Sequence, residues 1–311
     1  MTLSSGDLTT LPRVQLWLPG SGSTANPLLS SIIIPDASRT ITNKLNRARL
    51  FSQTFVRTID GVGNYQVVLP DYPVTEITSL QVGGQLILAA PLPVPGQPFL
   101  IPQNGFGGFG YRFVPWGGDL PGDPAVIEMV NGTFYRGVQN VKVTYQAGYE
   151  VQGEAHIVPN SPGPYTVTTF QPQGIWCRDN GVVYASNMTG LMSTTISPPP
   201  TGSYNPPPDP PGTLAALGQY TFSPGDAGKE ILLTYSFVPS DLEMACILLI
   251  AESFSYRDRI GQLDKILGGQ ETIRFLRGGF PRQMFPDLPP EVEARIWPYV
   301  NVIPPAIGAP V

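Results

Sequence analysis

The chain contains few of the residues on which catalytic, metal-binding and disulfide-stabilised proteins depend. Of its 311 residues only one is histidine and only two are cysteine. A metal site or an acid–base centre needs several side chains placed together, and the sequence around His156 offers no such cluster. Cys177 and Cys246 do not suggest a disulfide framework, and we expect Cys246 to be a buried free thiol. We therefore expect no catalytic residue, no cofactor and no metal ion.

The sequence is also short of charge and of long apolar runs. Charged residues make up 13% of the chain and the net charge is −5, so no global basic field is present to hold nucleic acid. The longest apolar run, residues 245–251, is far too short to span a bilayer, and we expect no membrane anchor. Residues 1–11 contain no basic residue and no long apolar run, which argues against a signal peptide.

Proline and glycine are abundant instead. With 36 prolines, 34 glycines and 10% aromatic residues, the composition predicts short strands and many turns. Disorder is not expected, because a disordered chain would be more charged and less aromatic. The length allows two ordinary domains, or one core that carries an insertion.

The stretch after Pro239 predicts the longest helix of the chain. We expect Ser240 to be its N-cap, Glu243 to complete a capping box three residues later, and Gly261 to end it. Apolar or compatible side chains recur there at helical spacing and predict a broad buried stripe: Leu242, Ala245, Cys246, Leu249, Ile250, Ser253 and Tyr256.

Two shorter helices are expected near the N-terminus. Residues 7–18 predict a short helix broken by Pro12, and residues 28–45 predict a second helix that Pro35 kinks or splits. A last helical turn is expected before Pro298.

The intervening residues change from helical spacing to alternation. Residues 51–88 predict a β-meander, followed by a long loop over residues 89–122. Two further strands, at residues 125–130 and 139–145, are expected to close this sheet.

Residues 150–237 differ from the rest, because they are poor in charge, rich in Thr, Ser, Pro and Tyr, and without helical periodicity. We predict an α+β fold: a small helical bundle with a β-meander, plus an inserted all-β, sandwich-like domain. Residues 1–149 and 238–311 would form the core, residues 150–237 the insertion, and residues 303–311 an extended C-terminal tail.

Several motifs of the sequence, taken in order, carry a family resemblance. They are Thr-Ile-Asp-Gly at 58–61, Leu-Pro-Asp-Tyr-Pro-Val at 69–74, Ser-Leu-Gln-Val-Gly-Gly at 79–84, Asn-Val-Lys-Val-Thr-Tyr-Gln-Ala-Gly-Tyr at 140–149, Val-Pro-Ser-Asp-Leu at 238–242 and Trp-Pro-Tyr-Val at 297–300. In this order they resemble the head–tail connector (adaptor, or head-completion) proteins of tailed bacteriophages, and the match covers the first half of the chain and the part after residue 237. The segment Tyr-Thr-Phe-Ser-Pro-Gly-Asp-Ala-Gly-Lys at 220–229 is similar to the edge of an immunoglobulin-like module of phage structural proteins.

The resemblance implies a structural virion protein of the neck, the head–tail junction, assembled in the host cytoplasm. Twelve copies would form a homo-oligomeric ring that binds the portal protein and extends the DNA channel. The ring would also provide the attachment platform for a tail, nozzle or tail-terminator protein. Genomic DNA would pass through the lumen during packaging and ejection without its sequence being read.

Contacts with other subunits or the portal are expected on the long helix, in the basic stretch after it and in the C-terminal tail. Across residues 257–282, six basic residues accompany three acidic ones. This pattern indicates either a solvated helix face with intrahelical pairs or an intersubunit charge pattern, and the resemblance favours the second. Residues 303–311 are uncharged and apolar, so we expect them to dock as a strand on the portal or on an adjacent copy. The expected contact residues are Leu249, Tyr256, Arg257, Arg259, Arg274, Arg277, Ile303 and Ile307.

Two other function classes stay open from the sequence. A receptor- or glycan-binding phage tail protein is the first alternative, because aromatic-rich β modules often bind sugars. An enzyme is the weaker alternative, and the lack of a His, Asp or Cys constellation counts against it.

Overall fold

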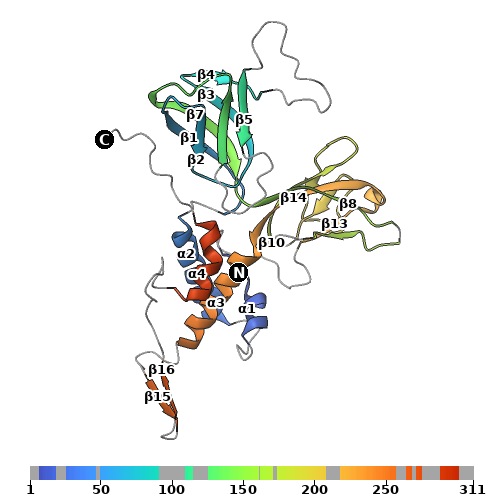
Figure 1. Cartoon of the computed structure of the whole chain (residues 1–311). Helices are drawn as coiled ribbons and strands as arrows, with labels where there is room; N and C mark the ends of the chain where they lie inside the picture. Colours follow the sequence, from blue (N-terminus) through green and yellow to red (C-terminus); the bar gives the residue numbers. More distant parts are fainter. Residues whose placement is uncertain are drawn as a thin grey trace, which may run out of the picture. The chain divides into compact units, whose positions relative to one another are not determined.

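Helices from both ends of the chain join the β-strands of its second half in one unit, and the strands of its first half form another (Figure 1). In this computed structural model the first unit comprises residues 1–45 and 150–298, and the second comprises residues 46–149 and 299–311. The structure describes residues 7–18, 26–46, 50–90, 109–114, 125–160, 162–170, 174–207, 218–256, 264–267, 271–274 and 288–300. These residues combine α-helices with mostly antiparallel sheets, so the predicted α+β class is confirmed.

Helix α3 (Ser240–Tyr256) is the centre of the helical part. It contacts α1 (Leu11–Trp17), α2 (Ile34–Leu45), α4 (Pro290–Ile296) and the π-helical turn η1 (Leu29–Ile33). A 3₁₀ turn, Trp297–Tyr299, follows α4 and contains Pro298. The side chains that fill this part are almost all apolar, which gives four helices one shared core: Leu8, Val14, Leu29, Ile34, Ala37, Ile41, Leu45, Leu242, Ala245, Cys246, Ile247, Ile250, Leu288, Val292 and Ile296.

Of the two prolines predicted to interrupt the N-terminal helices, Pro12 sits at a helix start and Pro35 lies within a longer helical run. Pro12 occupies the second position of α1, where the backbone N–H that proline lacks is one of the first-turn donors that have no intrahelical acceptor. Pro35 lies just after the π-helical turn η1, so the helix is irregular at the place where a kink or split was expected. The break at Pro12 is therefore wrong, and the helix before Pro35 passes through the π turn η1 into α2.

The expected capping box of α3 is also wrong. Strand β14 (Glu230–Pro239) runs directly into the helix, so Ser240 is its first residue and not a flanking cap. Glu243 does not serve the helix end, because its carboxylate lies against Arg13 and Thr9 of the N-terminal segment.

Residues between 150 and 239 form two sheets, called here the β module. Side chains of one sheet bond to side chains of the other, since the Trp176 Nε1–H donates to the Tyr220 hydroxyl at 3.1 Å. The first sheet has the order β10 (Gly174–Tyr184), β14, β8 (Glu150–Ile157); the second has the order β11 (Met192–Ser193), β12 (Ser203–Asn205), β13 (Gln219–Phe222), β9 (Thr166–Thr168).

The other unit also has two sheets, which share one apolar core. The predicted meander is wrong in its connectivity, because β1 pairs with β7, about eighty residues along the chain, instead of with β2. Strand β5 falls inside the predicted loop over residues 89–122. The first sheet has the order β1 (Gln53–Gly61), β7 (Gly137–Ala147), β3 (Val74–Val82), β4 (Gln85–Ile87); the second has the order β2 (Gln66–Leu69), β6 (Ala125–Val130), β5 (Gly110–Val114).

The charged residues after α3 include an antiparallel hairpin. Strand β15 (Asp264–Leu267) pairs with β16 (Glu271–Arg274), and Gly268–Gly269 lies between them in the sequence. One prediction for residues 257–282 is a solvated helix face. It is wrong for β15 and β16, because these residues form strands.

The units are also divided differently from the expected domains. The structure has the expected boundary after Tyr149. The helices, however, belong to the unit that contains the β module, and not to the unit of residues 46–149 as expected. The physical reason is the continuous passage from β14 into α3, which also contacts β10 and β14.

Candidate interaction surface

The side chains of α3 from Leu242 to Ile247 are mostly buried, and those after Ile250 are more exposed. Leu242 and Ile250 are fully buried, whereas Leu249 is half-buried and Glu252 and Ser253 are exposed. The predicted stripe is thus confirmed in the first half of the helix, while Ser253 does not belong to it. In the second half, the side chains of Glu252 and Ser253 are exposed to solvent.

A buried ion pair fixes α1 against the start of α3. Glu243 is 3% exposed and accepts hydrogen bonds from Arg13 Nε, from Arg13 Nη2 at 2.8 Å and from the Thr9 hydroxyl at 3.2 Å. Burial raises the pKa of Glu243, and the bonds from Arg13 and Thr9 oppose that rise. Loss of Arg13, itself 34% exposed, would leave the buried Glu243 carboxylate without its ion-pair partner, so this pair fixes how α1 packs.

Cys246 has a structural environment on the same helix. It is fully buried and its Sγ lies 3.5 Å from the Ser38 hydroxyl of α2. Burial raises the pKa of the Cys246 thiol to about 12, so the reactive thiolate is disfavoured at neutral pH. The prediction of a buried free thiol is confirmed.

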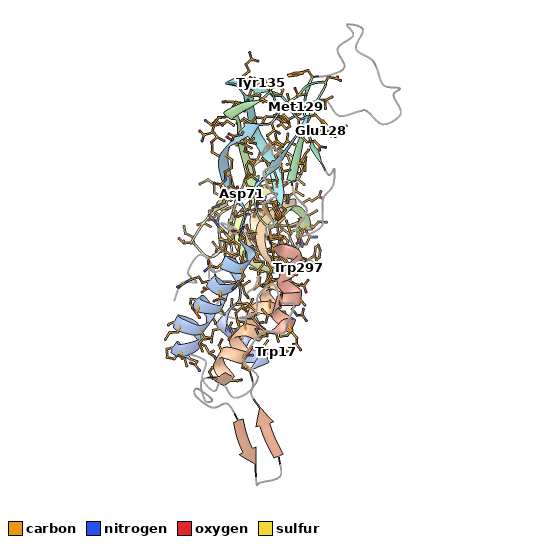
Figure 2. All side chains as sticks on the ribbon, turned by 60° about the vertical axis from the view of Figure 1, so that its left-hand side comes forward. Trp17, Asp71, Glu128, Met129, Tyr135 and Trp297 are labelled. Atoms are coloured by element: carbon orange, nitrogen blue, oxygen red, sulfur yellow. The ribbon has the colours of Figure 1, made fainter. Side chains whose placement is uncertain are left out.

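Three large apolar side chains of the helices face solvent, and we call them the exposed helix set: Leu16, Trp17 and Ile32. Leu16 is 71% exposed, Trp17 50% and Ile32 60%. They come from α1 and η1, which both contact α3, and Figure 2 shows Trp17 beside the helices, away from Trp297. The exposed helix set is the apolar surface that α1 and η1 present to solvent.

Sequence reasoning missed the exposed helix set, although a signal was present. In a seven-residue helix that buries only Val14, the positions of Leu16 and Trp17 turn away from the core at helical spacing. Treating 7–18 as a broken helix concealed that pattern.

Most of the predicted contact residues lie where the structure gives no side-chain placement. Leu249 is the exception, half-buried on α3. Tyr256 ends α3 and Arg274 ends β16, and nothing is described of their side chains. The remaining residues, together with the C-terminal tail, lie outside the described residues: Arg257, Arg259, Arg277, Ile303 and Ile307.

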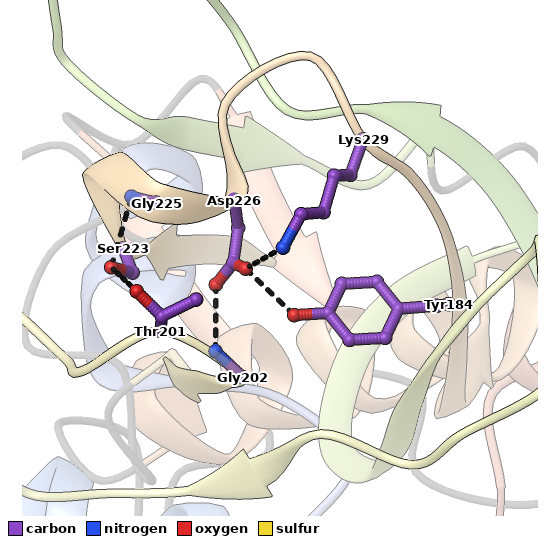
Figure 3. A network of polar contacts seen from close by, with 7 residues as sticks. All are labelled: Tyr184, Thr201, Gly202, Ser223, Gly225, Asp226 and Lys229. Carbon is purple, nitrogen blue, oxygen red and sulfur yellow. Dashed lines mark hydrogen bonds and ion pairs between the residues drawn. The ribbon is translucent and has the colours of Figure 1, made fainter.

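The motif at 220–229 builds a closed polar network in the β module (Figure 3). Asp226 is completely buried at the end of a 3₁₀ turn, Pro224–Asp226. Its Oδ1 accepts from the Tyr184 hydroxyl at 2.6 Å and from Lys229 Nζ at 2.8 Å, and its Oδ2 accepts from the Gly202 N–H at 3.1 Å. Both carboxylate oxygens of Asp226 accept hydrogen bonds from the protein itself. The network therefore stabilises the fold and does not offer this carboxylate to a ligand.

A second carboxylate links the two sheets of the β module. Asp179 accepts from the Tyr204 hydroxyl at 2.6 Å and from the Tyr220 hydroxyl at 3.1 Å. Burial and this carboxylate together raise the pKa of both tyrosines well above the usual range. The hydroxyls therefore stay protonated and serve as donors inside the sandwich.

His156 lies in a largely buried polar and aromatic cluster of the β module. Its side chain is 9% exposed, its Nε2 lies 2.6 Å from Glu154 Oε1, and its ring stacks on Phe170 with centroids 4.5 Å apart. Glu154 also accepts from the Phe170 N–H at 2.9 Å and from the Tyr235 hydroxyl at 2.6 Å. The histidine thus belongs to a structural cluster around a saturated carboxylate.

Comparisons with known proteins add no relative. No protein-family model matches the chain, and a search of curated proteins finds no match. Within the described ranges, no three His, Cys, Asp or Glu side chains gather as a metal site requires. None of the helices described is both long enough and apolar enough to cross a membrane.

Proposed function

We propose that this protein is a structural subunit of a phage head–tail connector ring. Twelve copies would close a ring that binds the portal protein, continues the DNA channel and presents a platform to a tail, nozzle or tail-terminator protein. The proposal combines the ordered sequence motifs with the exposed helix set, which supplies apolar side chains for a neighbouring subunit. It places the protein at the neck of the virion, assembled in the host cytoplasm.

The finer architecture belongs to the same proposal. The helices around α3 would form the ring-building core, and residues 150–237 would be an inserted module carried by it. Leu249, on the half-exposed part of α3, is the predicted contact with described side-chain placement, while the arginines and the C-terminal tail stay predictions.

The charge of the chain supports a passive role towards DNA. A net charge of −5 suits a lumen through which duplex DNA moves, because binding strength scales with the phosphates that Lys and Arg neutralise. Tight, salt-sensitive binding of duplex DNA by the purified protein would contradict this role.

A receptor- or glycan-binding function is the second candidate, and one observation favours it. Phe170 of the β module is 72% exposed, and its ring stacks on His156. This stacking orients an exposed aromatic ring on which a sugar ring could pack. Binding to a panel of glycans, abolished by Phe170→Ala, would support this candidate.

Electron microscopy of the purified protein tests the main proposal. We expect closed rings with a central opening, and we expect Trp17→Asp to abolish them because a charge cannot be buried unpaired at a subunit contact. Trp297→Asp is the matched control, since Trp297 is 57% exposed on another part of the helices. Compact trimers or single subunits in the wild-type images would contradict the proposal.

A further inference from the structure

The N-terminal segment of residues 7–18, called here the strap, lies along one face of α3. Glu243 and Cys246 are about one helical turn apart and share that face. The Thr9 hydroxyl donates to the Glu243 carboxylate at 3.2 Å, and Arg13 Nη2 donates to it at 2.8 Å. The middle of the strap is therefore tied to α3 through a single carboxylate.

The start of the strap closes over the Cys246 thiol. The Leu8 N–H donates to the Ser38 hydroxyl at 3.0 Å, and that hydroxyl lies 3.5 Å from Cys246 Sγ. Burial is the main cause of the raised pKa of Cys246, and the Asp7 charge adds to it, so Asp7 also lies near the thiol. Leu8 and Ser38 are themselves buried, so the strap and α2 together shield this sulfur from solvent.

The helix within the strap is weak by itself. Helix α1 has seven residues, and a helix this short is unstable in water on its own. Its N-cap residue, Thr10, forms no side-chain capping bond, and α1 has no acid in its first turn and no base in its last. Contacts with the rest of the helical part therefore keep α1 in place.

The strap also buries less than the helices beside it. Val14 is the one residue that α1 buries, whereas Leu16 and Trp17 face solvent. Helix α2 buries five residues, and α3 contacts all the other helices. Segments with few buried apolar contacts open at a smaller cost in free energy than the core, so the strap should open before α2 or α3.

We infer that the strap opens from the face of α3 as one unit while α2, α3 and α4 stay folded. The bonds to Glu243 and to Ser38 break together, because one short segment makes all of them. Opening exposes the carboxylate of Glu243 and the thiol of Cys246 at the same time. The fold thus contains a conformational switch, and this inference does not depend on the proposed ring.

Thiol labelling of the full chain tests the inference. N-ethylmaleimide reacts with accessible thiolates, and peptide mass spectrometry measures Cys246 separately from Cys177. We expect Cys246 to react more slowly than in chain unfolded by urea, at a rate that changes little in low urea because strap opening exposes little surface. A rate with the urea dependence of global unfolding would overturn the inference, as would a native rate equal to that of the unfolded chain.

Hydrogen exchange shows whether the strap moves as one unit. The amides of Leu8, Val14 and Leu18 are all hydrogen-bonded in the closed strap. They should exchange with one common protection factor, equal to that of the Cys246 thiol, and the amides of α2 should exchange about tenfold or more slowly. Strap amides that exchange as slowly as those of α2, or that exchange fast while Cys246 stays protected, would overturn the inference.

Replacement of Arg13 should open the strap selectively. Arg13→Ala leaves the buried Glu243 carboxylate without its ion-pair partner, so labelling of Cys246 should become about tenfold faster or more. Arg13→Lys keeps the charge but loses the two-pronged contact, and its rate should lie between those of the wild type and Arg13→Ala. Arg39→Ala removes an exposed cation of α2 and is the matched control, with an unchanged rate. Equal rates for Arg13→Ala and Arg39→Ala would show that these contacts do not hold the strap closed, and would contradict the inference.

Discussion

The two β regions of this protein achieve stability by different means. In the β module, the carboxylates of Asp226, Asp179 and Glu154 each accept hydrogen bonds from several donors, and that of Asp226 is fully buried. The unit of residues 46–149 relies on a continuous apolar core, and the Asp71 carboxylate, 11% exposed, accepts from Arg57 at 2.8 Å and from the Tyr145 hydroxyl at 2.6 Å.

The contrast follows from the lengths of the strands. The second sheet of the β module has strands of two to four residues, which bury little apolar surface, so polar networks must fix its turns. Strands β1, β3 and β7 have nine to eleven residues and present enough alternating apolar side chains to form a core.

The largest effect is expected from removing the central carboxylate of the β module. Asp226→Ala leaves the Tyr184 hydroxyl and the Gly202 N–H without an acceptor and should destabilise the module by about 4 kcal/mol. Denaturant unfolding followed by tryptophan fluorescence would measure this loss. Glu230→Ala, an exposed acid of the same module, is the control and should have little effect. A loss as small as the control's would show that the network is dispensable.

A slightly smaller effect is expected from a cavity in the apolar unit. Leu69 is fully buried, and Leu69→Ala should cost about 3 kcal/mol, because the apolar contacts are lost and the cavity collapses only in part. Leu88→Ala removes a 70% exposed side chain of the same unit and serves as the control. Comparable unfolding midpoints for the two variants would contradict the idea that this core holds the unit.

The polar contact of the apolar unit should matter less. Asp71→Asn keeps the shape of the side chain but removes the charge that Arg57 meets, and Arg57 is 42% exposed, so solvent can replace much of the contact. We expect a loss of about 1 kcal/mol in the free energy of unfolding. A loss as large as that of Asp226→Ala would mean that both regions depend equally on buried polar groups.

Alkaline pH should have the smallest effect and should destabilise both regions, because burial also raises the pKa of Tyr111 and Tyr145 in the apolar unit. Burial, aided by nearby carboxylates, raises the pKa of Tyr184, Tyr204 and Tyr220 in the β module. The folded state therefore holds these protons more tightly than the unfolded chain, whose tyrosines titrate near about pH 10, so stability is complete below that pH and falls above it. Unfolding midpoints at increasing pH would measure the slope, and Tyr204→Phe should flatten it. An unchanged slope would contradict this account.

The sequence predicted elements with strong local signals better than their connections. The core of α3 followed from the spacing of Leu242, Ala245 and Ile250, and the buried thiol from the position of Cys246 on that face. Pairing of β1 with β7 could not be predicted in this way, since it depends on contacts about eighty residues apart and has no local signature.

The side chains of the candidate surface and of the polar networks were predicted less well for a related reason. Glu243 fits a capping box by spacing, yet Arg13, 230 residues away, provides a better partner in the folded core. Asp226 lies in a motif that was recognised, but its role depends on Tyr184 and Gly202 from other segments. Local patterns define which residues can pair, and the tertiary fold selects the partner.

The native mass of the purified protein tests the central claim most directly. A connector subunit should give a closed assembly with a mass close to twelve times the 33.5 kDa of one chain. Leu249→Asp should reduce that mass to the single chain, because the half-buried side chain of α3 would carry a charge into the contact. A wild-type protein that stays monomeric or forms only a trimer over the micromolar range would contradict the account.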